Sequence, residues 1–360
     1  MKHKTLQVVL LIWLWLNLGS IGHTQQVLLN RPAHTVLDLE YSPDGLYMAR
    51  VYASGRLEVV DIDTDKIVID DSRSLASSLL KAKVSWSPTS EYFAAGIGAQ
   101  VFIWDIKEMR LLHTLNAGNN GDLIDREADY SVPEGFSSLQ WSSDSSLLMA
   151  QSLSSRYTVW SQEQQVPIFD EIIGNNPIPV VWRPDNRSIS SDLVVLDIFT
   201  HVRTQTHAKV IPWVNNTCGN TVSLATSLDR MYVIAGTGNG CIVLMEAITG
   251  DQTAAYKVTA NNDPVWDVSW SPDNNAVMAV TDQGSVIMTD LATGDFAIAA
   301  QTNGSLFAVD WSAINLSVTY GGHTEDNQPL IVTLSSVDIE QIMESNMLQQ
   351  PELSSTPITR

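Results

Sequence analysis

The feature that most constrains the fold is a unit that recurs seven times along the 360-residue chain. Related short segments surround seven anchor positions, which are Tyr41, Trp86, Trp141, Trp182, Thr226, Trp270 and Trp311. The anchors are separated by 45, 55, 41, 44, 44 and 41 residues, and an aliphatic residue stands two positions before each of them. Self-similarity with such a period is typical of repeat architectures, in which each copy is one supersecondary unit.

The copy around Trp270 shows what one unit contains. Four short strands are predicted, at Val265 to Trp270, Ala276 to Val280, Val286 to Thr289 and Phe296 to Ala300. Ser-Pro-Asp-Asn after the first strand suits a turn, because proline presets φ and aspartate can bond its own backbone. The inner strands are nearly continuous apolar runs, as expected for a sheet covered on both faces. One such sheet cannot bury two apolar faces alone, so the units must stack, and radial stacking closes a ring.

The third strand of each unit ends in motifs that resemble those of the WD40-repeat family of β-propellers. Trp104-Asp105 is the signature dipeptide of that family. Matching positions in other copies hold Asp61, Trp160 and Asp290, and AITGD and LATGD resemble the family's turn into the fourth strand. The resemblance covers residues 27 to 334. It implies an all-β fold, a seven-bladed β-propeller of four-stranded antiparallel blades.

The ends of the chain suggest how the ring closes. Val27 to Asn30 lies 14 residues before Tyr41 and reads as an outermost strand without partner strands of its own. The last unit ends near Leu334, after its third strand. The resemblance therefore implies that the N-terminal strand completes blade seven. The predicted organisation is a signal peptide at 1–24, the propeller at 25–336, and a C-terminal tail at 337–360 that begins as a short helix and ends disordered.

Residues 1 to 24 have the pattern of a secretory signal peptide. Two lysines precede an apolar segment from Leu6 to Leu18, and small residues follow it. Cleavage after Gly22 or Thr24 would release a secreted, periplasmic or extracellular protein. The alternative is an uncleaved membrane anchor, in which case the protein would contact a membrane.

The charge balance narrows the class of partner. The chain has 40 acidic and 20 basic residues, a formal net charge of −20. A surface this acidic repels phosphate backbones, so nucleic acid is a poor candidate and a basic peptide or protein a better one. Solubility alone is the alternative explanation of the charge.

The two cysteines, Cys218 and Cys241, fall in one unit. Export to an oxidising compartment would allow them to pair. Two strand spacings exceed the span of a disulfide, however, unless the loop that carries Cys218 arches outward. We therefore expect a buried free Cys241, with a Cys218–Cys241 disulfide as the alternative.

Three enlarged segments are predicted on one face of the ring, where the second-to-third strand loops and the connections between blades emerge. They are Asn116 to Gly135, Val210 to Asn220 and Gly321 to Pro329. Loops of the length of the first are uncommon unless they are functional or disordered. The first segment carries Asp122, Asp125, Glu127 and Asp129, whose spacing does not match a calcium loop. A solvated acidic loop, a partner contact and a cation site all remain open for it.

The second segment places Trp213 outside the repeat pattern. An exposed tryptophan would anchor an interface. The alternative is that Trp213 covers blade four, which is short. The sequence does not separate these readings.

Four carboxylates lie one or three positions before the anchors of three neighbouring blades. They are Asp38, Glu40, Asp267 and Asp310. Beside a narrow channel they could hold a cation or a basic side chain. Backbone amides and nearby hydroxyls more often satisfy such groups, and we expect that here. Trp266 and Phe307 open the same strands and predict an aromatic rim.

The sequence favours a binding function over catalysis. It contains neither an H-E-x-x-H metal motif nor a G-x-S-x-G nucleophile elbow. The first hypothesis is an exported monomeric scaffold, without cofactor or metal, that binds a protein or peptide on its loop-rich face. The alternative is a metal-dependent or hydrolytic propeller enzyme that combines His323, Glu325 and Asp326 of blade seven with His34 of blade one.

Overall fold

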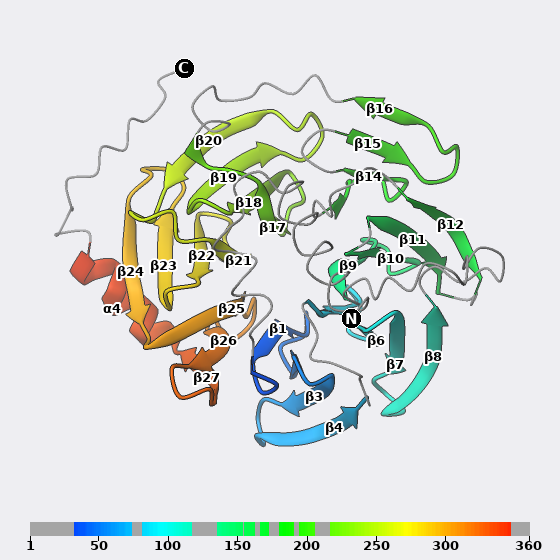
Figure 1. Cartoon of the computed structure of the whole chain (residues 1–360), viewed down its shortest axis with the longest axis horizontal. Coiled ribbons are helices and arrows are strands. Elements are labelled where there is room, and N and C mark those ends of the chain that lie inside the picture. The colour runs from blue at the N-terminus through cyan, green and yellow to red at the C-terminus, as the bar shows by residue number, and fades with distance from the viewer. Residues whose placement is uncertain are drawn as a thin grey trace, which may run out of the picture. The chain divides into compact units, whose positions relative to one another are not determined.

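In the computed structural model the sequence repeat forms seven antiparallel sheets, arranged as the blades of a ring (Figure 1). The structure describes residues 32–73, 81–116, 135–153, 155–162, 166–172, 180–190, 194–205 and 217–346. Six sheets contain four strands in consecutive order, and the sheet of blade seven contains three among the described residues. The predicted fold class is therefore confirmed. The predicted signal peptide, Val27 to Asn30 and the end of the C-terminal tail lie outside the described residues.

Each blade runs from an inner strand at the ring's centre to an outer strand (Figure 1). Blades one to three comprise β1 (Val36–Tyr41), β2 (Tyr47–Tyr52), β3 (Arg56–Asp61), β4 (Lys66–Ser72), β5 (Lys83–Trp86), β6 (Tyr92–Ile97), β7 (Gln100–Asp105), β8 (Arg110–Asn116), β9 (Phe136–Trp141), β10 (Leu147–Ser152), β11 (Arg156–Ser161) and β12 (Pro167–Ile172). Blades four to six comprise β13 (Val181–Trp182), β14 (Ser188–Ser190), β15 (Val194–Asp197), β16 (Arg203–Gln205), β17 (Thr221–Thr226), β18 (Tyr232–Thr237), β19 (Cys241–Glu246), β20 (Gln252–Lys257), β21 (Val265–Trp270), β22 (Ala276–Thr281), β23 (Ser285–Asp290) and β24 (Phe296–Gln301). Blade seven comprises β25 (Gly304–Trp311), β26 (Val318–Thr324) and β27 (Pro329–Leu334), and α4 (Ser336–Asn346) follows it.

The antiparallel order gives the ring two chemically different faces. The first-to-second and third-to-fourth strand turns emerge on one side, which we call the turn face. The second-to-third strand turns and the connections between blades emerge on the other, the loop-bearing face. One predicted insertion is wrong, because Gly321 to Thr324 belong to strand β26 and residues 325–328 alone form the turn.

A serine and an aspartate two residues apart hold the first turn of the unit together. In blade six Ser271 Oγ donates to Asp273 Oδ1 over 2.6 Å and accepts from the Ala276 amide over 2.8 Å. The same serine-to-aspartate bond joins Ser42 to Asp44, Ser142 to Asp144, and Ser227 to Asp229. The bond is local, so it forms wherever the sequence recurs.

A separate apolar core fills each of the seven contacts between neighbouring blades. The core between blades one and two is the most extensive, and it includes Leu57, Phe93 and Trp104. The core between blades seven and one is the smallest, and its buried members are Val36, Leu39, Tyr52 and Ala308. Every blade thus shares its flanks with two neighbours, as the stacking argument predicts.

Helix α4 extends the core between blades six and seven. It packs against β24 and β27 at the outer side of these blades (Figure 1). Ile339 on the helix is 4% exposed and belongs to this core. A capping box starts the helix, because Ser335 Oγ accepts from the Asp338 amide and Asp338 Oδ2 accepts from the Ser335 amide. No helix in the described part of the chain has the length and hydropathy needed to span a membrane.

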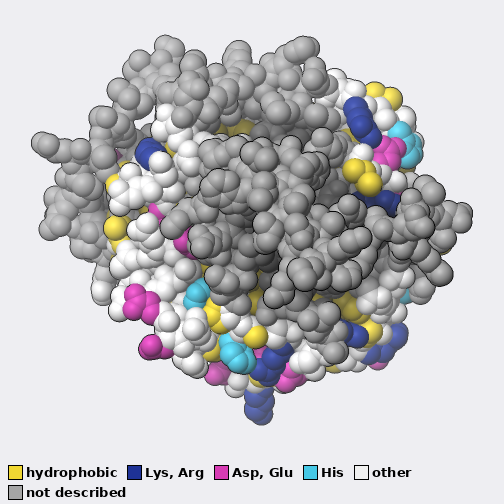
Figure 2. Space-filling model, in the orientation of Figure 1, with side chains coloured by type: hydrophobic (Ala, Val, Ile, Leu, Met, Phe, Trp, Pro, Cys, Tyr) yellow, Lys and Arg dark blue, Asp and Glu magenta, His cyan; other side chains and the backbone are white. Residues whose placement is uncertain are grey.

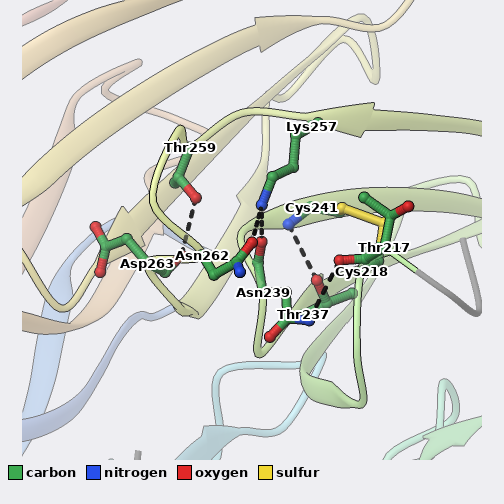
Figure 3. Close-up of a disulfide and its surroundings, with 9 residues drawn as sticks. All are labelled: Thr217, Cys218, Thr237, Asn239, Cys241, Lys257, Thr259, Asn262 and Asp263. Atoms are coloured by element: carbon green, nitrogen blue, oxygen red, sulfur yellow. Dashed lines mark hydrogen bonds between the residues drawn. A yellow bond between two sulfur atoms is a disulfide. The ribbon is translucent and has the colours of Figure 1, made fainter. Parts of the chain in front are cut away.

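Cys218 and Cys241 form a disulfide, which corrects the expectation of a free Cys241 (Figure 3). Their Cα atoms are 5.3 Å apart. The segment that precedes β17 lies along the β18–β19 turn, where the Asn239 amide donates to the Cys218 carbonyl and the Gly238 amide to the Asn220 carbonyl. This path carries Cys218 past two strands to the start of β19, a displacement that strand spacing alone did not reveal.

Candidate functional site

The four predicted inner-strand carboxylates meet at the centre of the ring with a lysine that the sequence reasoning missed. Asp38 and Glu40 lie on β1, Asp267 on β21, Asp310 on β25 and Lys83 on β5. We call these five residues the inner-strand cluster. Lys83 stands three positions before its anchor, the same position as Asp38 and Asp267 in their own units, so comparing that column across the copies could have found it.

Lys83 is the cation of the inner-strand cluster. Its Nζ lies 2.7 Å from Asp38 Oδ1 and 3.9 Å from Asp267 Oδ1. The Asp38 side chain is 7% exposed and that of Lys83 is 24% exposed, so the carboxylate is largely withdrawn from water while the lysine keeps partial access to it. A basic side chain from blade two thereby joins carboxylates from blades one and six across blade seven.

Each carboxylate of the cluster also accepts a backbone amide from the next blade. The pairs are Asp38 with the Val84 amide at 2.8 Å, Glu40 with the Trp86 amide at 3.2 Å, Asp267 with the Val309 amide at 3.0 Å, and Asp310 with the Tyr41 amide at 2.7 Å. Ser269 Oγ donates to Asp310 Oδ1 at 2.9 Å and accepts from the Trp311 amide at 3.0 Å. Amides or hydroxyls bond all four carboxylates, as expected, and the alternative of a basic side chain holds as well for Asp38 and Asp267, which face Lys83.

The anchor tryptophans make a second set of bonds between blades. In four of the five anchor tryptophans the indole Nε1 donates to a backbone carbonyl on the first strand of the preceding blade, whereas Trp311 Nε1 is buried without a hydrogen-bond partner among the described residues. The pairs are Trp86 with Glu40 at 3.0 Å, Trp141 with Ser85 at 3.3 Å, Trp182 with Gln140 at 2.9 Å and Trp270 with Ala225 at 3.0 Å. This recurring bond gives a physical reason for tryptophan at the anchor.

Burial shifts the pKa values of the inner-strand cluster. It raises the pKa of Asp310 to about 7 and the pKa of Asp267 to about 6, the latter despite the attraction of Lys83. Burial also raises the pKa of Glu40 well above its ordinary value, and Asp310 and Asp38 add to the rise. Burial lowers the pKa of Lys83, but the charges of Asp38 and Asp267 outweigh this and hold it above its ordinary value.

The cluster is therefore built to join blades. Its carboxylates already bind amides of neighbouring strands, and the Lys83 ammonium lies where a bound cation would have to sit. In the part of the chain that the structure describes, no group of three or more His, Cys, Asp or Glu side chains is arranged to hold a metal ion.

Trp266 and Phe307 pack inside the blade contact and do not form the predicted aromatic rim. They are 7% and 4% exposed, and their ring centroids are 5.8 Å apart. His323 stacks on Phe307 at 5.7 Å, and its Nδ1 lies 3.1 Å from Thr35 Oγ1. These rings form a continuous row from blade six to blade seven, beside the start of blade one.

Among the described residues, His34, His323, Glu325 and Asp326 do not form a group that could hold a metal ion. His34 is exposed before β1, and Glu325 and Asp326 are exposed in the β26–β27 turn. On the face drawn in Figure 2, the described acidic, basic and apolar side chains are interspersed. Five further candidates lie outside the described residues, namely Asp122, Asp125, Glu127, Asp129 and Trp213.

The ring of seven meander sheets, joined at its centre by side chains that cross from blade to blade, defines a seven-bladed β-propeller. The family model of the WD domain, G-beta repeat, matches residues 253–290, from β20 to the end of β23. The match, in one of the repeats, and the seven blades together support a WD40-repeat propeller. No curated protein gives a significant match. Propellers of this family commonly act as platforms for proteins or peptides and are generally not catalytic.

Replacing Lys83 with methionine should lower the free energy of unfolding by about 3 kcal/mol, because it leaves the Asp38 carboxylate buried without its cation. Adding Asp38→Asn should recover part of the loss, since a neutral amide needs no counter-charge. Denaturant titration measures both changes. Asp70→Asn breaks an exposed pair with Arg56 and serves as the control, with an expected loss below about 1 kcal/mol. Equal losses for Lys83→Met and the control would contradict the assignment.

Asp310→Asn should flatten the pH dependence of stability between about pH 4 and pH 7. The folded chain holds the Asp310 proton more tightly than the unfolded chain does, because its pKa rises from 3.8 to about 7. Its contribution to the free energy of unfolding is thus fully present below pH 4 and is lost as the pH rises through 7. Denaturant titrations across this range test the prediction, with Asp70→Asn as the control. A decline as steep as that of the parent between pH 5 and pH 7 would refute it.

Proposed function

We propose that the chain is an exported scaffold that binds a protein or peptide partner on its loop-bearing face and performs no catalysis. One observation carries the choice of face. Residues 117–134 begin after β8 and end before β9, and residues 206–216 begin after β16 and end before Thr217. All four of these ends emerge on the loop-bearing face. Both enlarged connections are therefore attached where a partner could contact them together.

The charge of the chain suggests the chemistry of that partner. The formal net charge is −20, and the connection 117–134 carries Asp122, Asp125, Glu127 and Asp129. A basic protein or peptide would be attracted to such a face, and a nucleic acid would be repelled. Trp213, in the second connection, would supply the apolar anchor. We propose that a monomer binds this partner.

The arrangement of titratable groups favours a scaffold over the alternative enzyme. Asp38, Asp267 and Asp310 bind amides of neighbouring blades and are thereby committed to the ring. His323 is engaged with Thr35 and Phe307, whereas Glu325 and Asp326 are exposed in the adjacent turn. A hydrolytic or metal-dependent reaction would need these groups to converge on one point.

The disulfide supports export. Both Cys218 and Cys241 are fully buried, and they tie the entry of blade five to its third strand. Disulfides persist in oxidising compartments and are rare in the cytosol. Residues 1 to 24, which have the pattern of a signal peptide, give an independent reason for the same compartment.

Replacing residues 117–134 with a short Gly-Ser linker should abolish partner capture while the ring stays folded. The experiment compares the proteins retained by the immobilised parent and by this variant from the extracytoplasmic fraction of the source cells. A double variant Glu325→Gln and Asp326→Asn is the control on the same face. If the linker variant retains the same partners as the parent, with an unchanged melting temperature, the loop-bearing face is not the binding face.

The exported protein should begin at His23 or Gln25, and its thiols should resist alkylation after unfolding without reductant. Intact mass and N-terminal sequencing of the protein outside the cytoplasm measure the start. Alkylation with and without reductant measures the disulfide. An intracellular protein that keeps Met1 and has two reactive thiols would contradict export.

A further inference from the structure

The exposed apolar side chains of the turns lie on the face opposite the long connections. Every large apolar side chain that is exposed in an inter-strand turn of the described chain belongs to the turn face. The described turns of the loop-bearing face expose none. Among the described residues, exposed large apolar side chains of the turns are therefore confined to the turn face.

Blade five carries three of these side chains, more than any other blade in the described part of the chain. Leu228 is 59% exposed, Met231 55% and Ile248 57%. Leu228 and Met231 lie in the β17–β18 turn and Ile248 in the β19–β20 turn. The Ala247 amide donates to the Met231 carbonyl at 2.9 Å, so the two turns lie side by side. We call these three side chains the blade-five patch.

The fold does not require apolar residues at these positions. Polar residues stand at the position of Met231 in four blades, namely Glu91, Ser146, Arg187 and Asn275, whereas blades one and seven carry Leu46 and Leu316 there. The position of Leu228 holds proline in blades one, two, four and six and Ser143 in blade three. All these turns have the same role in the ring. The blade-five patch therefore adds exposed apolar surface that turn formation does not explain.

Acidic groups surround the blade-five patch. The described turn-face segments of blades five and six contain Asp229, Glu246, Asp251, Asp273, Asp290 and Asp295. Arg230 is the one basic residue in the same segments. Its guanidinium is partly buried and feels the charge of Asp144 on blade three, and burial lowers its pKa. The turn-face segments of blades five and six are thus strongly negative, whereas the β13–β14 turn of the neighbouring blade four carries Arg183, Asp185 and Arg187.

We propose that the turn face of blades five and six is a second binding surface, which takes a partner segment carrying Lys or Arg beside large apolar residues. The apolar side chains of the segment pack on Leu228, Met231 and Ile248. Its cations meet carboxylates such as Glu246 and Asp295 at the edge. Apolar anchors give most of the affinity in such contacts, and charge gives orientation and rate of association. This surface lies across the ring from the loop-bearing face and goes beyond the function proposed above.

Selection from a random library of 12-residue peptides tests the proposal with the oxidised full chain as target. The selection is then repeated with the triple variant Leu228→Ser, Met231→Ser and Ile248→Thr added free in solution as a competitor. The competitor removes peptides that bind elsewhere on the protein. The peptides that remain should contain both basic and large apolar residues. Their affinity for the variant should be at least tenfold lower, and their affinity for the parent should fall as salt is added. Glu246→Gln with Asp295→Asn should weaken binding and reduce its salt dependence.

A matched variant shows whether the loss is specific. Ile67→Thr, Ile172→Thr and Ile298→Thr remove a similar apolar area from the outer strands β4, β12 and β24, and they should leave peptide affinity within twofold. Enrichment of neutral or acidic peptides, or equal binding to the patch variant, would overturn the proposal. So would a dimer of the parent that the patch variant abolishes, because a second copy would then be the occupant. Deleting 117–134 should leave this binding intact, which separates it from the loop-bearing face.

Discussion

The contact between neighbouring blades is the interaction on which the rest of the structure depends. A blade presents two apolar flanks and has no layer of its own to cover them, so each flank is buried only by the next blade. Seven separate cores fill these contacts, and indole-to-carbonyl bonds such as that of Trp270 to Ala225 fix the position of one blade against the next. Apolar burial drives the association, and the directional bonds set the register of one blade on the next.

The contact between blades seven and one has the smallest apolar core of the seven. Its buried core is limited to Val36, Leu39, Tyr52 and Ala308. Polar bonds supplement it, because Tyr41 bonds Thr319 at 2.5 Å and its amide binds Asp310. On the same flank of blade one, Glu58 is 2% exposed and accepts from Tyr52 and Arg50. A mispaired blade would leave the buried Asp310 carboxylate without the Tyr41 amide, which favours one closure of the ring.

The fold could be predicted because its signals are local and repeat along the chain. Parts of the site could not, because they depend on contacts between residues that are far apart in the sequence. Each Ser-x-Asp turn lies within a few residues of sequence, so its copies align along the chain from their residues alone. Lys83 was missed because its partners are 45 and 184 positions away along the chain, on other blades. The disulfide was not predicted because the path of the segment before β17, which brings Cys218 to Cys241 across two strand spacings, cannot be read from the sequence. Trp266 is an aromatic at the start of a strand, and the sequence could not show that it packs on Phe307, which in turn stacks on His323.

The residues that hold the ring together are different from those exposed on its faces, which explains why the two faces can differ chemically. The charges that join the blades at the centre, such as Lys83 with Asp38, lie between inner strands. The exposed side chains at the turn tips take no part in these contacts. Turn tips can then change from proline to leucine, as at Leu228, while the Ser227–Asp229 bond that shapes the turn persists. An exposed aliphatic side chain there gains nothing from folding, since it stays in water in the isolated chain. Its free energy of burial remains available for a partner, which is the physical basis for assigning a binding role to the turn face of blade five.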